Sequence, residues 1–482
     1  MTIDVAHEAR ARRWTLRDEG EQDVLDGSSL ISLPAASDGL RIGSGAPLRV
    51  ATLAAAEPDL IASARRVLLA AAAEPVETLT TTDGRSFGER AAALREARPD
   101  AVLVVAGEPV SADALVDLCE ALRFGCADQR PQPRVLVSGD ARTALRLHQV
   151  LRELPIEVLS DPRRDDGHAA LVGRARALRR LTDTALVLRD EALEALARAI
   201  AHDTGDPTLV VDVSGSSTSL VRAEPTGALL AGHLVPLGCG RGADRVVARA
   251  GLDRVRRWIP WAVDAPTLLE RVFNRARWPD AVPAERLALA LEIALAHEAV
   301  RHVLEDLQAA GISHEHLRAT PLIVLTGMLA ELPRAAQSVL IVANALQPTV
   351  VTSLLRDQDD ALVALGAAAA RSGGLRIRDA LAAARQPIAA IAPVSAEGKG
   401  SLHVSGGVSV ARQDKIARGA FFAVASNGPL EVSVSGGAVR RLTAGACGLV
   451  IDARGHPLEL PPRDAERVPA VARWFSSLEA LP

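Results

Sequence analysis

The sequence predicts an α/β protein with a small β domain at its C-terminal end, and three observations support this class. Strand-like and helix-like segments alternate between residues 48 and 204, which is the pattern of a mostly parallel sheet. Three apolar strands then follow one another between residues 208 and 235 with no helix between them. After residue 374 the chain is rich in Val, Ser and Gly, and turn signals such as Ser405-Gly406-Gly407 and Asn427-Gly428 separate short strands.

In the first half, short apolar runs predict strands, and apolar residues at helical spacing predict helices. Pro58 stands where the first turn of a helix tolerates proline. The expected order is strand 48–53, helix 59–73, helix 86–97, strand 101–105, helix 113–123, strand 133–137, helix 141–151, strand 156–159, and helices that fill 167–204.

In the second half we expect a meander of three strands followed by helices. The long helix carries apolar residues such as Leu287, Leu291 and Leu304 at a spacing that suits a helix lying across a sheet. The expected order is strand 208–213, strand 219–223, strand 227–235, helix 242–250, long helix 284–310, strand 322–325, the short strands of the β domain, and a final helix at 464–478.

These patterns divide the chain into four expected segments. They are a weakly patterned N-terminal segment at 1–46, a first α/β lobe at 47–204, a second lobe at 205–375, and a β-rich C-terminal domain with a final helix at 376–482.

The composition excludes several classes of protein. The 482 residues carry a net charge of -4 with both signs mixed, and aromatic residues make up only 2% with no tyrosine. The chain therefore lacks the basic stripe and the stacking residues of nucleic-acid binders, and we expect no nucleic-acid partner. Lys399 and Lys415 are the only lysines, which excludes a lysine nucleophile in the central region.

The cysteines and the N-terminus predict a cytoplasmic protein. Cys119, Cys126, Cys239 and Cys447 form no C-x-x-C pair, so neither a disulfide framework nor a zinc site is indicated. The first fourteen residues have no apolar core of a signal peptide, and no apolar run reaches membrane-spanning length. We expect no membrane partner.

The first candidate site is the turn that follows the strand with Asp212. It contains Ser214, Gly215, Ser217 and Thr218. Glycine and small hydroxyl residues can bring backbone N–H groups close to a phosphate, and a carboxylate at the strand end can hold a hydrated metal ion or orient a water. The alternative is an ordinary hairpin in which these residues serve only the turn.

Two other glycine-containing loops are candidates for the same site. Gly238, Gly240 and Gly242 form a bend that enters a helix, and such a bend can face a phosphate. A Rossmann fingerprint is disfavoured, because the strand before this bend belongs to the meander. Thr326-Gly327 ends an aliphatic strand, where a glycine permits close approach of a ligand; a plain strand-to-helix turn explains it equally well.

The histidines do not indicate a metal site. His314 and His316 lie in a short polar loop and His302 lies one helix earlier, without carboxylate or cysteine partners at ligand spacing. We interpret them as isolated surface residues, and His403 and His456 likewise.

Taken in order, these motifs resemble those of the actin, sugar-kinase and heat-shock-chaperone ATPase superfamily. More narrowly, the chain resembles the glutamate mutase-associated MutL family, which is unrelated to the mismatch-repair protein of that name. Residues 212–219 are similar to the family's D-x-G-G-x-T-T-D, and residues 257–260 to its R-W-x-P. Residues 344–348 are similar to its D-A-L-Q-P, and residues 448–455 to its actinobacterial-type tail.

The resemblance implies a two-lobed actin-like (ribonuclease H-like) ATPase fold and a role as reactivating factor or chaperone of an adenosylcobalamin-dependent mutase. It implies that ATP and Mg²⁺ bind, with Asp212 holding hydrated Mg²⁺ or orienting water. It also implies that the other members of the site contact the nucleotide: Ser214, Gly215, Ser217 and Thr218 at the phosphates, Gly238, Gly240 and Gly242 along the cleft, and Thr326 with Gly327 near the nucleoside.

The sequence departs from the family at several positions. Ser214 stands for the first glycine of the phosphate turn, Ser219 for its second aspartate, and Met328 for a later glycine. A first phosphate hairpin, which the family places before Leu48, is not recognisable, and Ala106-Gly107-Glu108-Pro109 replaces a glycine-rich segment. A catalytically inactive pseudo-ATPase scaffold is therefore the alternative, and a small-molecule kinase of the same superfamily is the third.

Overall fold

The structure, a computed structural model, describes residues 2–7, 10–15, 40–43, 47–106, 112–139, 141–179, 186–279, 281–372, 386–394, 402–406, 412–413, 416–426, 428–434 and 438–482. Lys399, Lys415, Gly107 to Pro109, Gly407 and Asn427 lie outside these residues. Within the described part of the chain, no helix combines the length and the hydropathy needed to cross a membrane.

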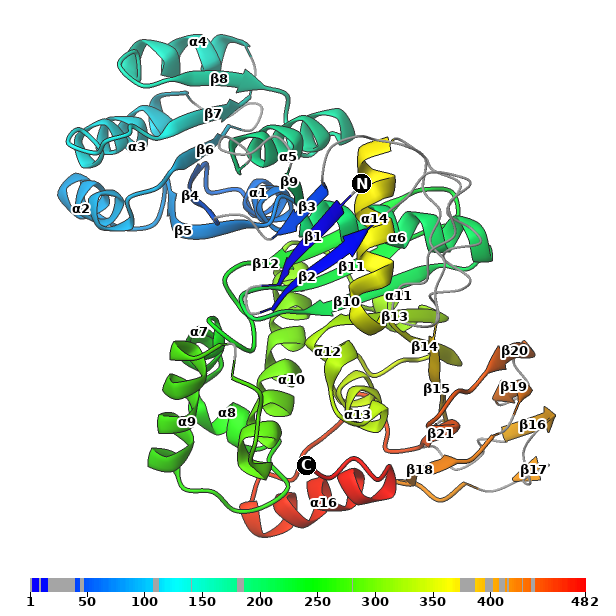
Figure 1. The fold of residues 1–482 in the computed structure, drawn as a ribbon. Helices are drawn as coiled ribbons and strands as arrows, with labels where there is room; N and C mark the ends of the chain where they lie inside the picture. The colour runs from blue at the N-terminus through cyan, green and yellow to red at the C-terminus, as the bar shows by residue number, and fades with distance from the viewer. Residues whose placement is uncertain are drawn as a thin grey trace.

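The first half of the chain folds as a parallel α/β domain, as predicted. Its strand order is β5-β4-β6-β7-β8, and every neighbouring pair is parallel. Helices α1 and α5 cover one face, and α2, α3 and α4 cover the other (Figure 1). The bounds are β4 Leu48–Ala54, α1 Pro58–Ala70, β5 Ala73–Thr80, α2 Phe87–Ala97, β6 Ala101–Val105, α3 Ala112–Gly125, β7 Arg134–Ser138, α4 Ala141–Val150, β8 Ile156–Leu159 and α5 Asp165–Arg179.

Strand β5 was not predicted. The expected helix at 59–73 ends at Ala70, because the chain reverses at Ala72, which has a φ of 50°. The strand contains Pro75 and several polar residues, so it lacks the apolar pattern that predicts a strand. Proline is tolerated at this position because β5 lies at the edge of the sheet, where a missing N–H costs no ladder hydrogen bond.

The second half is built on an eight-stranded sheet of order β12-β11-β10-β13-β14-β15-β21-β18. The predicted meander is confirmed, since β10, β11 and β12 are antiparallel neighbours, and β13 and β14 run parallel to β10. The bounds are β10 Thr208–Val213, β11 Thr218–Ala223, β12 Leu229–Leu234, β13 Leu322–Gly327, β14 Thr352–Arg356, β15 Gln386–Pro393, β18 Phe421–Val424 and β21 Leu449–Asp452.

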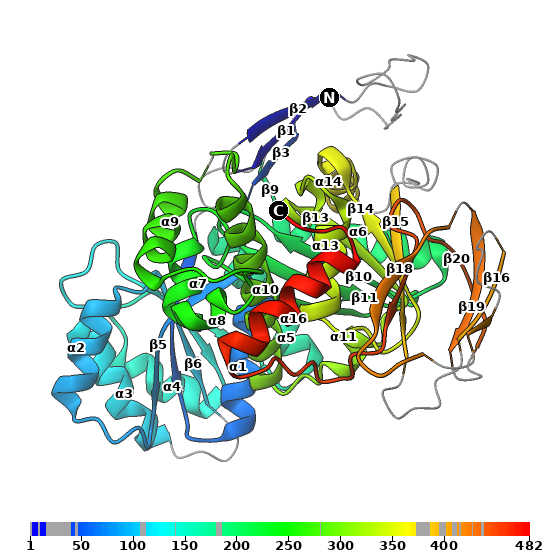
Figure 2. The same cartoon turned by 90° about the horizontal axis from the view of Figure 1, so that it is seen from below.

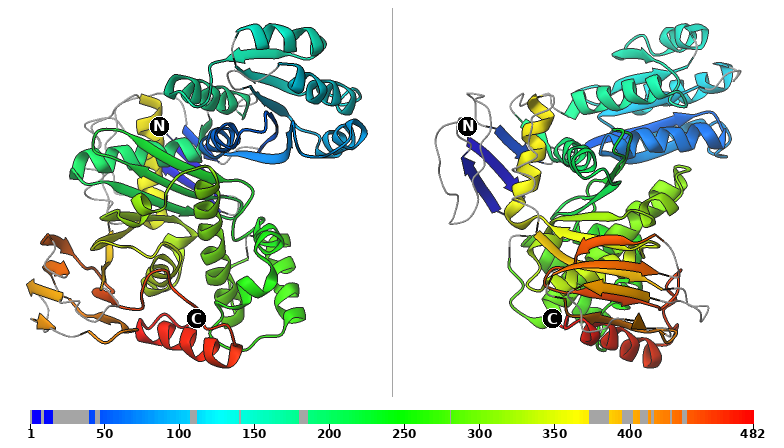
Figure 3. Two further views of the ribbon diagram at one scale, coloured as in Figure 1. Left: turned by 180° about the vertical axis from the view of Figure 1, so that it is seen from behind. Right: turned by 90° about the vertical axis from the view of Figure 1, so that its right-hand side faces the viewer.

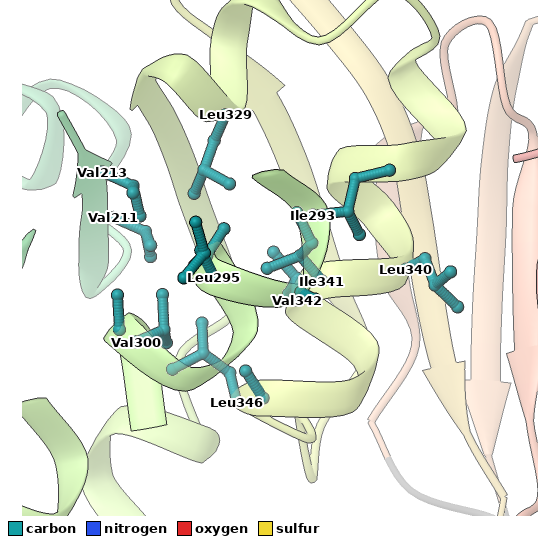
Figure 4. Close-up of a cluster of buried hydrophobic side chains, with 14 of the residues drawn as sticks. Val211, Val213, Ile293, Leu295, Val300, Leu329, Leu340, Ile341, Val342 and Leu346 are labelled. Atoms are coloured by element: carbon teal, nitrogen blue, oxygen red, sulfur yellow. The ribbon is translucent and has the colours of Figure 1, made fainter. Parts of the chain in front are cut away.

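Helices cover both faces of this sheet. The predicted long helix, α10 (Arg286–Ala309), and α13 (Ala335–Ala345) pack on one face, where Figure 4 shows Val211 and Val213 of β10 pointing toward Leu295 of α10. On the other face lie α6 (Arg189–Thr204) and α14 (Ala361–Ser372). The remaining helices are α7 Ala243–Ala250, α8 Leu252–Arg256, α9 Ala265–Arg277, α11 Glu315–Arg318, α12 Met328–Glu331 and the short η1 Gln358–Asp360.

A small N-terminal sheet packs on the outer side of α6 and α14. Its order is β2-β1-β3-β9, with β1 (Thr2–His7) and β2 (Arg10–Thr15) antiparallel, and β3 (Leu40–Gly43) parallel to β1 and to β9 (Leu186–Leu188). Figure 3 shows this sheet, α14 and the central sheet as successive layers. A hairpin therefore lies before Leu48, where none was recognisable in the sequence, because β2 consists largely of arginine and alanine.

The C-terminal part differs from the expected separate β domain. Strands β15, β18 and β21 extend the central sheet, while β16 (Leu402–Gly406), β17 (Arg412–Gln413), β19 (Pro429–Val434) and β20 (Arg440–Thr443) form a second sheet. The two sheets share one apolar cluster. The final helix, α16 (Asp464–Ser477), lies across α13, as Figure 2 shows, and buries Val471 and Phe475.

Candidate functional site

Asp212 lies at the carboxyl end of β10, beside Thr326 of β13. The strand register pairs Asp212 with Thr326 and Val213 with Gly327. The Thr326 hydroxyl donates a hydrogen bond of 2.7 Å to Oδ1 of Asp212. Gly327 has a φ of +63°, and a Cβ there would lie 2.5 Å from the Val213 carbonyl oxygen and 2.9 Å from Oδ1 of Asp212. Asp212, Thr326 and Gly327 therefore meet, and only glycine fits at position 327.

Ser214 and Ser217 close the turn after Asp212 by bonding to each other. The Ser214 N–H donates to the Ser217 carbonyl oxygen at 2.8 Å, and the Ser217 N–H donates to Oγ of Ser214 at 3.0 Å. The two hydroxyl oxygens lie 2.8 Å apart. The Thr218 hydroxyl donates to the Leu237 carbonyl oxygen at 2.9 Å. The side chains expected to contact phosphate are thus buried and bonded within the protein.

The glycine bend packs directly on this serine turn. The N–H groups of Gly240 and Gly242 donate to the Gly215 carbonyl oxygen at 2.9 and 3.0 Å. A Cβ on Gly238 would lie 2.5 Å from the Ser214 carbonyl oxygen, and one on Gly242 would lie 2.4 Å from the Gly238 nitrogen. The glycines therefore allow two loops of the protein to touch. The serine turn therefore contacts both other predicted loops, the glycine bend through Gly215 and the Thr326-Gly327 segment through the paired ends of β10 and β13.

Arg189, which the sequence reasoning missed, is the principal partner of Asp212. Its Nε lies 3.2 Å from both carboxylate oxygens, and its Nη2 lies 2.7 Å from Oδ1. The same Nη2 lies 3.1 Å from Oδ1 of Asp360. Arg189 is 5% exposed and Asp212 is 0% exposed. Burial by itself would lower the pKa of Arg189, but the charges of Asp212 and Asp360 outweigh it and hold this pKa above its ordinary value.

The segment between β14 and α14 contains two buried carboxylates, Asp357 and Asp360, and the exposed Asp359. Asp359 and Asp360 have φ values of 64° and 57°, a region in which residues other than glycine are strained. Asp357 accepts the N–H groups of Leu362 at 2.7 Å and Val363 at 3.0 Å and thereby caps α14. Burial, and then the negative charge of Asp360, raise the pKa of Asp357 well above its ordinary value. The Arg189 guanidinium therefore bonds to two buried carboxylates, Asp212 and Asp360, and its charge also acts on the buried Asp357.

The sequence held a signal for these acidic residues but none for the arginine. Asp357-x-Asp359-Asp360 follows a strand that neighbours the Thr326 strand, so its carboxylates fall at the same sheet edge as Asp212. Arg189 precedes Asp212 by 23 positions on a helix, and no spacing rule connects such a pair.

The resemblance implies ATP and Mg²⁺ at this place, and Asp212 as arranged does not fit Mg²⁺. A hydrated Mg²⁺ requires a carboxylate oxygen that faces water, whereas Asp212 is fully buried and its oxygens accept hydrogen bonds from Arg189 and Thr326. Within the described residues, no group of three or more His, Cys, Asp or Glu is placed to hold a metal ion.

Ser219, at the position of the family's second aspartate, contacts a buried histidine. Its Oγ lies 2.8 Å from Nδ1 of His233, whose Nε2 lies 3.4 Å from Oε1 of Glu194 on α6. Arg176 of α5 donates to the same Glu194 at 2.5 Å and to the Ala70 carbonyl oxygen at 2.6 Å. Ser219 therefore belongs to a chain of polar contacts that links α5 of the parallel domain to the meander.

The R-W-x-P segment packs against α10, on the face of the central sheet opposite to α6. The Trp258 indole N–H donates to Oε1 of the fully buried Glu298 at 2.7 Å, and Arg257 donates to the same oxygen at 3.0 Å. Arg254 lies 2.9 Å from Oε2 of Glu298. The Trp258 ring stacks on His297 with a centroid distance of 4.5 Å.

His297 continues this network toward the C-terminal strands. Its Nδ1–H donates to the Ile293 carbonyl oxygen at 2.7 Å, and its Nε2 accepts from Nδ2 of Asn344 at 3.1 Å. Arg454 donates to Oδ1 of Asn344 at 2.7 Å and pairs with Asp452 at 2.8 and 2.9 Å. Segments 257–260, 344–348 and 448–455, which the resemblance singled out, thus meet in one buried network with a structural role.

The histidines predicted to be isolated behave in two ways. His302 is 1% exposed and lies 2.9 Å from Oε2 of Glu305, so its assignment to the surface was wrong: it faces the core side of α10. His314 is half-buried and pairs with Gln308, while His316 and His403 are exposed. His456 is half-buried.

Cys119, Cys126 and Cys239 are buried, and Cys447 is half-buried.

No protein-family model matches the sequence, and no curated protein matches it. Solved structures similar to this one include the activator of the 2-hydroxyisocaproyl-CoA dehydratase from Clostridium difficile with bound ADPNP. It is 14% identical, with 48% of this chain and 79% of that chain covered and a TM-score of 0.23. A carbohydrate kinase from Novosphingobium aromaticivorans is 17% identical, with 49% and 54% covered and a TM-score of 0.22. Similarity of this size establishes neither a family nor an activity for this chain.

Proposed function

We propose that this protein is an accessory, partner-binding protein of the MutL-like type in which the ATPase site is inactive. The observation that carries this proposal is the Arg189 guanidinium, which binds the carboxylate of Asp212 where a hydrated metal ion would be expected. An arginine supplies the positive charge that a buried aspartate needs, and it cannot be deprotonated or exchanged like a metal ion.

The packing of the loops supports the same conclusion. Phosphoryl transfer depends on backbone donors and cations that surround the phosphates. Here the carbonyl oxygens and N–H groups of the serine turn and the glycine bend are used to hold the two loops together. We propose, on the resemblance alone, that the partner is a subunit of an adenosylcobalamin-dependent mutase, and that this partner binds without nucleotide.

An ATP-dependent reactivating factor is the second candidate, and the meeting of the three predicted loops at Asp212 favours it. It would require Arg189 to leave Asp212 before MgATP could enter. No general base for a small-molecule kinase is identified at this site.

Thermal unfolding and ATP turnover separate these candidates. For an inactive site, millimolar MgATP leaves the melting temperature unchanged and turnover is the same in the wild type and in Asp212→Ala. A purified mutase subunit should then be retained by the protein equally with and without MgATP. Turnover that disappears in Asp212→Ala would establish the second candidate and exclude the first.

A further inference from the structure

A cavity lies between the parallel domain and the helices α7 and α10 of the second half. Its volume is about 230 Å³, and it is lined by α1, β4 and β5 on one side and by Arg249 of α7 and Asp306 of α10 on the other. Figure 1 shows α1 and β5 on the side of the parallel domain that faces β12 and α10. The cavity is separate from Arg189 and Asp212, and it has no part in the function proposed above.

The walls of the cavity are mainly apolar. Leu68 and Leu69 of α1 and Pro75 of β5 form much of this surface. An engineered apolar cavity of roughly 150 Å³ suffices to hold benzene. The space is therefore enough for an apolar body of somewhat more than six carbon atoms.

A hydroxyl group in the cavity lacks a hydrogen-bond partner. Thr52, in the middle of β4, lines the cavity and is only 3% exposed. Within the described residues its hydroxyl makes no hydrogen bond, and it is open to the cavity instead of being sealed in the core. Because this hydroxyl lines the cavity, a ligand with a hydrogen-bonding atom at this end would gain one hydrogen bond.

The mouth of the cavity carries one uncompensated positive charge. Arg249 and Asp306 form an ion pair and neutralise each other. Arg65 of α1 is exposed and forms no ion pair with a described residue. A guanidinium in this position is suited to bind a carboxylate through two parallel hydrogen bonds.

We propose that the cavity binds a small amphipathic monocarboxylate. Arg65 binds the carboxylate, the walls formed by Leu68, Leu69 and Pro75 cover the apolar body, and Thr52 bonds to a polar group distant from the carboxylate. Because the cavity is lined by the parallel domain and by α7 and α10, the bound molecule strengthens an interface that the Arg245–Glu74 ion pair of 2.9 Å already spans.

Isothermal titration of the full chain tests the proposal with three probes: hexanoate, its terminally hydroxylated derivative, and hexanamide. We expect hexanoate to bind at least about tenfold more tightly than hexanamide, because the amide carries no charge and offers the guanidinium one acceptor oxygen in place of two. The hydroxylated derivative should bind more tightly than hexanoate. Arg65→Gln should remove the advantage of the carboxylate, and Thr52→Val should remove only the advantage of the hydroxyl.

The matched control is Arg473→Gln, which removes another exposed arginine, on α16, and should change none of the affinities. Absence of binding at millimolar hexanoate, or equal affinities in the wild type and Arg65→Gln, overturns the proposal. None of these results depends on nucleotide, so the outcome is independent of the MgATP experiment.

Discussion

The guanidinium of Arg189 and the carboxylate of Asp212 form a buried pair, with Nη2 2.7 Å from Oδ1 and Nε 3.2 Å from both oxygens. This contact joins α6 to the strand end on which the serine turn and the glycine bend converge. Asp360 shares the same Nη2 and thereby connects the start of α14 to the same place. One guanidinium thus compensates two buried carboxylates, so removal of Arg189 leaves both without a cation.

Replacement of Arg189 by methionine should be strongly destabilising. It leaves Asp212 and Asp360 buried without a cation, and breaking a buried pair costs about 3–5 kcal/mol. The difference in unfolding free energy between the wild type and this variant should become smaller toward pH 5, because buried carboxyl groups without a partner are protonated more easily. Urea denaturation at the two pH values measures both effects. Arg198→Met, on the exposed face of the same helix, is the control and should be near neutral. A small, pH-independent change in Arg189→Met would contradict this description.

The same variant should acquire a response to divalent cations. Without the guanidinium, Asp212 and Asp360 are two carboxylates that previously shared one cationic nitrogen, and oxygen ligands of this kind suit Mg²⁺ and Mn²⁺. Millimolar Mn²⁺ should therefore raise the melting temperature of Arg189→Met and EDTA should reverse the rise. The wild type should show no response. An equal shift in both proteins would place the cation elsewhere.

Gly238→Ala should destabilise the protein in the absence of any nucleotide. The new methyl group would lie 2.5 Å from the Ser214 carbonyl oxygen, so the two loops must separate, at a cost of about 1–3 kcal/mol. Gly173→Ala is the matched control: it lies in α5 with no atom within 4 Å of the new Cβ, and should be neutral or gain about 0.5–1 kcal/mol. If Gly238→Ala unfolds at the wild-type midpoint, the glycine is not required for loop packing.

The buried His297 should make the protein less stable in mild acid. Burial lowers its pKa from the ordinary 6.5 to about 4. The unfolded chain therefore binds a proton at a pH where the folded protein does not, so stability falls as the pH decreases from about 6.5 to about 4. The full loss is about 3 kcal/mol. Denaturant midpoints across this range should fall more steeply for the wild type than for His297→Gln, and parallel curves would exclude His297 as the cause.

The elements predicted from the sequence are those whose signal is local. Strand Ala101–Val105 is a continuous apolar run, and the meander is three such runs separated by turns. Strands β2 and β5 were not predicted, since β2 is rich in arginine and β5 contains proline and several polar residues, so neither has a clear apolar alternation. In the C-terminal part the strand pattern was recognised, but not that three of its strands would complete the central sheet.

By itself the sequence determined which loops belong to the candidate site, because Asp212, the glycine bend and Thr326-Gly327 each end or follow a recognisable strand, and the ends of paired strands must meet. Only the tertiary structure decided what those loops contact. Charge compensation in a buried site is set by whichever side chain the fold brings within hydrogen-bond distance, and Arg189 reaches Asp212 because α6 packs across β10, a placement that no local pattern encodes.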